Sequence, residues 1–277
     1  MTTRPRNLID PYQPTPARLH SVFLGGKDHY ETDKALAAAL SSSTIGAALT
    51  ESRRFTRRAI EYLSDHHGVS QFVELGCGLP HVPDIHDIAE QHNSTARTLY
   101  VDSDIVVAAH GRALLHEPPT RFFTATDLTD TDAILNDITT VMDMTALLAV
   151  CVSGTAESIP DAPAVLAELT AQFPVGTWLV LTHVTDEFYP DHIRAAAETL
   201  RRAGIPYHPR GRDAITAMLA GYQLLAPGLI APHRWTPTRH RDDNGNNAGI
   251  RRLSATAPRH RATWDLSAYA AIGQRKQ

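Results

Sequence analysis

The fold is decided by one stretch of the sequence, Phe72-Val73-Glu74-Leu75-Gly76-Cys77-Gly78-Leu79-Pro80. Its first four residues are nearly continuous in apolar character, which is typical of a strand buried on both faces. Gly76 and Gly78 predict a tight turn, since glycine adopts positive φ without strain and lets the backbone approach a ligand. A helical pattern begins soon afterwards, at Ile85. The stretch therefore predicts a strand, a glycine turn and a helix, the opening unit of an α/β sheet.

The same alternation continues along the chain. Further strands are expected at Thr98–Val101, Arg121–Ala125, Ala146–Val152 and Trp178–Val184, with two late candidates at Gln223–Ile230 and Ala268–Gly273. Helices are expected between them, with Thr50 and Asp213 as N-caps of helices over Glu51–Ser64 and Asp213–Ala220. Arg239–Pro258, rich in Arg, Asp, Asn and Gly, is expected to be a long exposed loop. Such alternation predicts a parallel sheet with helices on both faces.

Acidic residues follow the second and third predicted strands. Asp102 ends the second strand, where a carboxylate can accept hydrogen bonds from both ribose hydroxyls of a nucleoside. Alternatively Asp102 caps the helix near Ile105, although Asp104 could do so equally well. Asp127, with Leu128 beside it, could read an adenine edge, or could simply begin a turn. With the glycine turn, these acids predict adenosine binding at the carboxyl ends of the first three strands.

The glycine turn does not match a dinucleotide fingerprint. The pattern G-x-G-x-x-G would require glycine at position 81, which is His81, and Pro80 and Pro83 flank it. This favours a nucleoside ligand without a pyrophosphate. An NAD-dependent oxidoreductase is therefore the weaker interpretation.

Composition narrows the possible partners. The net charge of −4 and the pI near 6.4 provide no broad attraction to nucleic acid or to an anionic membrane. The arginines at 53, 54, 57 and 58 could form a local basic patch, but a solvated helix face is the simpler interpretation. No apolar run is long enough to span a membrane, and the N-terminus lacks a secretory signal. Cys77 and Cys151 are expected to be reduced thiols, which favours a cytoplasmic protein.

The motifs together resemble a known superfamily. Glu74-Leu-Gly-Cys-Gly78, Asp102 and Asp127-Leu128, in this order, resemble the first motifs of class I methyltransferases that use S-adenosylmethionine (SAM). The segment Ala17–Tyr30, with its Leu-Gly-Gly-Lys-Asp box, is similar to the N-terminal signature of an actinobacterial methyltransferase-like family, DUF574. The resemblance covers most of the chain, since further matches lie at Phe72–His86, Tyr100–His110, Pro227–Trp235 and Tyr269–Gly273.

The resemblance implies a Rossmann-like class I methyltransferase fold, a seven-stranded mostly parallel sheet whose last two strands are antiparallel. It implies a helical N-terminal extension over residues 1–68, packed as a lid on the cofactor site, and a SAM-binding domain over residues 69–277. SAM is the expected cofactor. The residues expected to bind it are Gly76, Cys77, Gly78, Asp102, Ser103, Asp127, Leu128, Ser153, Lys27, Gly26 and Arg18. Lys27 could pair with the methionine carboxylate of SAM, or with Asp28 on the surface.

The loop after the fourth strand departs from the family pattern. Where the family commonly has an apolar-His-Phe-x-Pro-Asp stretch, this chain has small polar residues over 153–158, before Pro160 and Asp161. Candidate general bases are His183 and Glu157, although both could serve purely structural roles. The expected function is methyl transfer from SAM to a small-molecule acceptor. The alternative is a catalytically inactive SAM-binding sensor or partner-binding protein. No histidine or cysteine spacing indicates a metal site.

Overall fold

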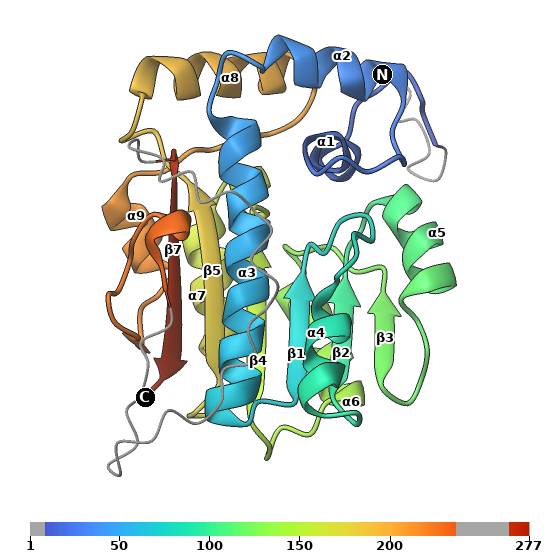
Figure 1. Ribbon diagram of the computed structural model, residues 1–277, viewed down its shortest axis with the longest axis vertical. Helices are drawn as coiled ribbons and strands as arrows, with labels where there is room; N and C mark the ends of the chain where they lie inside the picture. The colour runs from blue at the N-terminus through green and yellow to red at the C-terminus, as the bar shows by residue number, and fades with distance from the viewer. Residues whose placement is uncertain (1–8, 237–265, 277) are drawn as a thin grey trace.

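A seven-stranded sheet forms the centre of the computed structural model, which describes residues 9–236 and 266–276 (Figure 1). The strand order is β3-β2-β1-β4-β5-β7-β6. All neighbouring pairs are parallel except those of β7, which is antiparallel to both β5 and β6. The strands are β1 Gln71–Leu75, β2 Arg97–Val101, β3 Arg121–Thr124, β4 Leu148–Ser153, β5 Trp178–Val184, β6 Tyr222–Leu224 and β7 Ala268–Arg275. The predicted seven-stranded α/β fold, with its antiparallel final pair, is confirmed.

Helices cover both faces of the sheet, as the continuous apolar strands require. One face packs against α3 (Ile45–His67), α4 (Ile85–His92) and α5 (Ile105–Leu114). The other packs against α6 (Thr131–Val141), α7 (Ala162–Thr170) and α9 (Arg212–Ala217). Because both faces are buried, only the ends of the strands remain free to form a binding site.

A third group of helices lies at the carboxyl edge of the sheet. These are α1 (Pro16–Phe23), α2 (Glu31–Ala39) and α8 (Pro190–Arg202), which share an apolar cluster with the first turns of α3. In Figure 1, α1 is seen nearly end-on above the tips of β1 and β2. The N-terminal helices are therefore divided between two positions, since α3 packs on the sheet face and α1 covers the strand ends.

Two predicted helix caps were wrong. The helix expected to begin after Thr50 begins at Ile45, because its buried face already includes Ile45, Ala48 and Leu49, and Thr50 lies inside it. Gly211, not Asp213, occupies the N-cap position of α9. The free N–H of Arg212 donates instead to Glu187 Oε1 at 2.6 Å, a partner distant in sequence.

The other differences concern element boundaries. The strand expected over Gln223–Ile230 ends at Leu224, since the chain turns at Pro227 and Gly228 and pairs again only through a bridge between Ile230 and Ala270. The loop predicted over Arg239–Pro258 lies outside the described residues.

Cys77 and Cys151 are both free thiols, as expected. Among the described residues, no helix is long and apolar enough to cross a membrane.

Candidate functional site

A cavity of about 470 Å³ lies between α1 and the carboxyl ends of the parallel strands. This volume falls within the range of small-molecule sites, roughly 300–1,000 Å³. The loops after β1, β2, β3 and β4 and the start of α1 supply its walls, which are formed by Thr15, Pro16, Ala17, His20, Gly76, Gly78, Asp102, Ser103, Asp104, Asp127, Leu128, Thr129, Gly154, Thr155, Ser158, Ile159 and Pro160. The glycine turn and both predicted acids thus meet at one cavity.

The glycine turn has the predicted backbone. Gly76 has a φ of +69° and Gly78 a φ of +67°. This is the left-handed region, in which the backbone of a residue with a side chain is strained. The N–H of Gly76 donates to the carbonyl of Val101, at the end of the neighbouring strand. A Cβ at Gly76 would lie 2.2 Å from Thr155 Cγ2, whereas a Cβ at Gly78 would meet nothing within 4 Å. Gly76 therefore allows close packing of two loops, and Gly78 leaves space in the cavity.

This difference predicts unequal effects of two matched substitutions. Gly78→Ala should lower the free energy of unfolding by about 1–2 kcal/mol, the cost of a positive φ alone. Gly76→Ala should lower it by about 2–5 kcal/mol, because a steric clash with Thr155 is added to the same backbone strain. Urea denaturation of the two variants provides the measurement. Equal losses would mean that Thr155 moves aside freely.

Asp102 holds the glycine turn through its carboxylate. Oδ2 accepts a hydrogen bond from the N–H of Gly78 at 2.9 Å, and Oδ1 accepts one from the N–H of Asp104 at 2.9 Å. Burial raises the pKa of Asp102 to about 6, although these two bonds oppose the shift. The capping role belongs to Asp104, whose carboxylate accepts from the N–H groups of Val106 and Val107. Asp102 therefore remains available at the tip of β2, with Ser103 beside it in the cavity wall.

Asp127 begins a turn at the wall of the cavity. Its Oδ1 accepts from the N–H and the hydroxyl of Thr129, at 2.9 Å and 2.8 Å, so that it does begin a turn. The turn also places Asp127 and Leu128 in the wall of the cavity, opposite the loop after β4. The two interpretations of this residue are therefore compatible.

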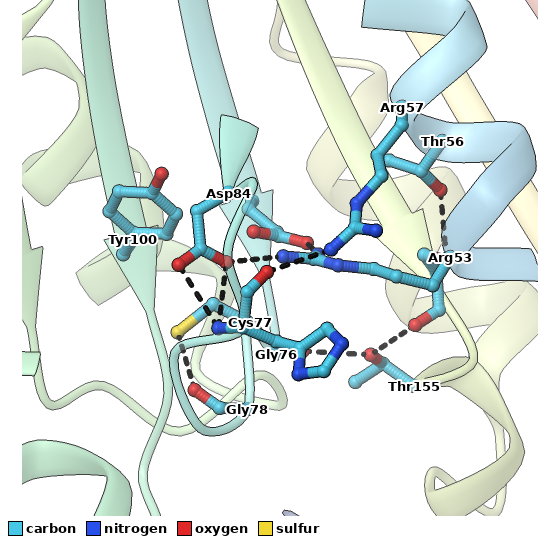
Figure 2. Close-up of polar contacts among 12 residues, drawn as sticks. Arg53, Thr56, Arg57, Gly76, Cys77, Gly78, Asp84, Tyr100 and Thr155 are labelled. Carbon is cyan, nitrogen blue, oxygen red and sulfur yellow. Dashed lines mark hydrogen bonds and ion pairs between the residues drawn. The ribbon is translucent and has the colours of Figure 1, made fainter. Parts of the chain in front are cut away.

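A narrow pocket of about 40 Å³ adjoins the cavity on the side of α3, and we call it the extension. Buried Arg53 of α3 crosses its end and pairs with Glu74 of β1 and with Asp84, where Nη2 lies 2.6 Å from Asp84 Oδ1 (Figure 2). Asp84 also accepts from the N–H of His81 and begins α4. One guanidinium thus balances two buried carboxylates, and the helix, the first strand and the glycine loop are joined.

Glu74 has an unsatisfied oxygen. Oε1 binds Arg53, but buried Oε2 has no hydrogen-bond partner. Burial raises the pKa of Glu74 to about 7, while the charge of Arg53 lowers it. Cys77 lies nearby in the wall, and burial together with the charge of Asp102 raises the pKa of its thiol well above the ordinary value. The extension therefore contains an uncharged thiol and a carboxylate with spare acceptor capacity.

The remaining expected cofactor residues lie in different surroundings. Ser153 borders the extension, and its hydroxyl lies 3.0 Å from Thr56 Oγ1 and 3.1 Å from Thr182 Oγ1. Arg18 points away from the cavity, since its buried Nε donates to Asp33 Oδ2 at 2.9 Å. Gly26 and exposed Lys27 follow α1 and do not line the cavity or its extension. In the described part of the chain, no ion pair joins Lys27 to Asp28.

The two predicted base candidates are buried beside each other under the end of β5. Arg210 can only donate, so His183 Nε2 accepts from its Nη1 at 3.0 Å, and Nδ1 donates to the carbonyl of Val184 at 2.6 Å. Glu157 Oε1 accepts from the N–H of Val184 at 2.6 Å. Neither residue lines the cavity or its extension. Their positions favour the structural roles considered for them.

Three features of this site were not predicted from the sequence. They are the positions of His20 and Arg53 and the unpaired Oε2 of Glu74. The arginines of α3 were interpreted as a solvated face, yet the side chain of Arg53 is only 10% exposed, against 62% for Arg54. A carboxylate inside an apolar strand was the signal that a buried cation was needed. Among the described residues, no group of three or more His, Cys, Asp or Glu could hold a metal ion.

Comparisons with known proteins agree with this geometry. A family model described as S-adenosyl methyltransferase matches residues 2–276. A DUF574 family protein from Streptomyces avermitilis is 26% identical, with a TM-score of 0.80 over 95% of this chain and 98% of that one. A methyltransferase candidate from Thermobifida fusca is 28% identical, with a TM-score of 0.81 over 96% of each chain. No curated protein matches.

A more distant similarity concerns the fold alone. The plantazolicin methyltransferase BpumL, solved with a triazolic desmethylPZN analog and S-adenosylhomocysteine (SAH), is 9% identical, with a TM-score of 0.51 over 94% of this chain and 96% of that one. The family match spans nearly the whole sequence, including the glycine turn, both acids and the N-terminal helices. The chain belongs to the S-adenosyl methyltransferase family and is a SAM-dependent methyltransferase.

Proposed function

We propose that the chain transfers the methyl group of SAM to a small-molecule acceptor held between α1 and the loop after β4. One observation carries this proposal. The cavity at the strand ends and its extension adjoin, since both are lined by Ala17, His20, Gly76, Gly78 and Gly154. Two adjoining spaces suit a ligand with a nucleoside at one end and an amino acid at the other.

The wide half of the cavity fits the nucleoside. Asp102 would accept hydrogen bonds from the two ribose hydroxyls, since an ionised carboxylate has about four acceptor positions and the described residues use only two of them. Asp127 would accept from the exocyclic amine of adenine, with Leu128 against the ring. Gly78 supports this placement, because the space beside its Cα would otherwise be filled by a side chain.

The narrow extension fits the methionine part of the donor. Oε2 of Glu74 is buried and lacks a partner, which is costly unless a ligand supplies a hydrogen. An α-ammonium group would supply both the hydrogen and a compensating charge. Arg53 would act as a positioning residue by holding the other oxygen of Glu74. Lys27 remains a predicted partner of the methionine carboxylate, and Gly26 remains a predicted contact of the cofactor. Both contacts would require the segment after α1 to close over the site.

The arrangement also favours a small acceptor. When bound, SAM supplies a methyl group activated by the positive charge on sulfur. The chain then has to align the acceptor with this group and exclude water, and positioning alone can lower the barrier considerably. Helix α1 covers the strand ends and leaves a cavity of about 470 Å³ for both molecules. Free Cys77 and Cys151 are compatible with a reducing cytoplasm.

Ligand-induced stabilisation tests the proposal. SAM and SAH should each raise the melting temperature, since a ligand at about 100 times its Kd adds about 2.7 kcal/mol of stability. NAD should have no effect, because the turn lacks the third glycine of a dinucleotide site. Stabilisation by NAD alone would contradict the proposal. Release of SAH from SAM with a panel of acceptors then distinguishes an enzyme from a SAM-binding sensor.

A further inference from the structure

The junction between the cavity and its extension contains a single titratable side chain. The five residues that line both spaces are three glycines, Ala17 and His20. If the donor lies as proposed above, its sulfur and methyl group occupy this junction, between the nucleoside and the methionine part. We propose that His20 is the general base of the methyl transfer and that the acceptor is a small molecule with a phenolic hydroxyl. This inference rests on the proposed function.

His20 faces the loop after β4 across the junction. It lies in α1, one turn after Ala17. An ideal Cβ at Gly154 would be 3.5 Å from His20 Cε1, so the ring approaches the backbone at the tip of β4. No hydrogen bond or ion pair engages the ring nitrogens of His20 within the described ranges, 9–236 and 266–276. The ring therefore lies against this loop, and its nitrogens remain available to bind another molecule.

His20 is also in the protonation state that a base requires. Burial lowers its pKa from the ordinary value, and the negative charge of Glu157 partly offsets this shift. The ring is consequently neutral near pH 7 and can accept a proton. His183, by contrast, has both nitrogens engaged by Val184 and Arg210. Of His20 and His183, only His20 has ring nitrogens without a partner in the described part of the chain.

The proposed step is balanced within the site. As the acceptor oxygen attacks the methyl carbon, a new carbon–oxygen bond forms and the carbon–sulfur bond breaks. The electron pair of the broken bond stays on sulfur, giving SAH, while the hydroxyl proton passes to a ring nitrogen of His20. The imidazolium returns this proton to solvent after the products leave. No oxidant, reductant or metal is needed.

The base and the cavity wall together favour one class of acceptor. A phenolic hydroxyl is more acidic than an alkyl hydroxyl and gives up its proton to a neutral imidazole more readily. A carboxylate acceptor is already ionised and would need no base. The wall of the cavity includes the apolar side chains of Pro16, Ile159 and Pro160, which can pack against an aromatic ring, beside the hydroxyls of Thr155 and Ser158.

Two probe acceptors separate a base from a structural residue. Phenol is protonated in mildly alkaline buffer, whereas 4-nitrophenol is ionised and needs no base. With SAM as donor, His20→Asn should reduce SAH formation by about 100-fold with phenol, as expected for loss of a general base, and by less than about threefold with 4-nitrophenol. The exposed helical residue His92 provides the matched control, and His92→Asn should leave both rates unchanged.

A binding measurement gives a second readout. SAH should shift the Cε1–H signal of His20 in a carbon–proton correlation spectrum, and His20→Asn should bind SAH within about threefold of the wild type, since the ring does not hold the donor. Equal losses with both probes, an unmoved His20 signal, or no transfer to either probe by wild-type protein that binds SAH would each overturn the proposal. Failure of the proposed function would instead appear as no binding of SAH.

Discussion

Replacing Arg53 with methionine should lower the free energy of unfolding by about 3–5 kcal/mol, the largest loss of stability expected for an exchange on α3. The buried guanidinium pairs with Glu74 and Asp84, which are themselves almost fully buried. Methionine fills much of the same volume but leaves the two carboxylates without their hydrogen-bonded cation, since nearby Arg57 donates to the carbonyl of His81 instead. Chemical denaturation without ligand, analysed as a two-state transition, measures the effect.

The neighbouring arginine provides the control. Arg54 is 62% exposed and lies 3.4 Å from Glu51, one helical turn away, so Arg54→Met should change stability by no more than about 1 kcal/mol. Both exchanges remove one positive charge from the same helix. Similar effects for the two variants would show that general electrostatics, not the buried cluster, determines the result.

The loss of unfolding free energy caused by Arg53→Met should also depend on pH. Burial raises the pKa of Glu74 to about 7 even with Arg53 present. A carboxyl group with a raised folded-state pKa binds its proton more tightly when folded, so its protonation favours the folded state as the pH falls. Without Arg53 the pKa rises further. The difference between variant and wild type should therefore shrink as the pH falls from about 9 to 7, where Glu74 is protonated in the variant but still largely ionised in the wild type, and a constant difference over that range would contradict this account.

Most of the fold and part of the site could be predicted from the sequence, for identifiable reasons. Continuous apolar runs such as Trp178–Val184 predicted strands well, because a strand buried on both faces must be apolar throughout. Asp102 was predictable because local order places it at a strand tip. The contact between Glu187 and Arg212 could not be predicted, because it joins loops far apart in the chain. Local patterns report periodicity but not such distant pairs.

The same limit explains why the N-terminal helices were only partly understood. The box that resembles the family signature directed attention to Lys27, yet the residues of α1 that reach the cavity lie earlier, at Ala17 and His20. Arg18 lies between them but turns to Asp33, since a helix points successive side chains in different directions. A specific motif therefore identifies the segment, while the helical phase decides which of its residues meet the ligand.

Removal of the Asp102 carboxylate should have the largest effect on ligand binding. Asp102→Ala should weaken SAH binding by about 100-fold or more, because hydrogen bonds to a charged group contribute about 1.5–3 kcal/mol each and two ribose hydroxyls lose their acceptor. Asp132→Asn, which removes an exposed carboxylate from the first turn of α6, is the control and should leave affinity unchanged. Calorimetric titration with SAH measures both.

The pH dependence of SAH binding tests the same residue. Because the pKa of Asp102 is about 6 in the free protein, the carboxylate is ionised above that pH and increasingly protonated below it. Glu74, with a pKa of about 7, titrates in both the wild type and Asp102→Asn, so its effect cancels in the ratio of their SAH affinities. A protonated Asp102 loses acceptor capacity, so this ratio should be constant above pH 6 and shrink by up to about tenfold per unit below it. A ratio that is constant through pH 6, or Asp102→Ala binding within about threefold of wild type, would remove Asp102 from the ribose site, since its loss should cost at least one charge-assisted hydrogen bond.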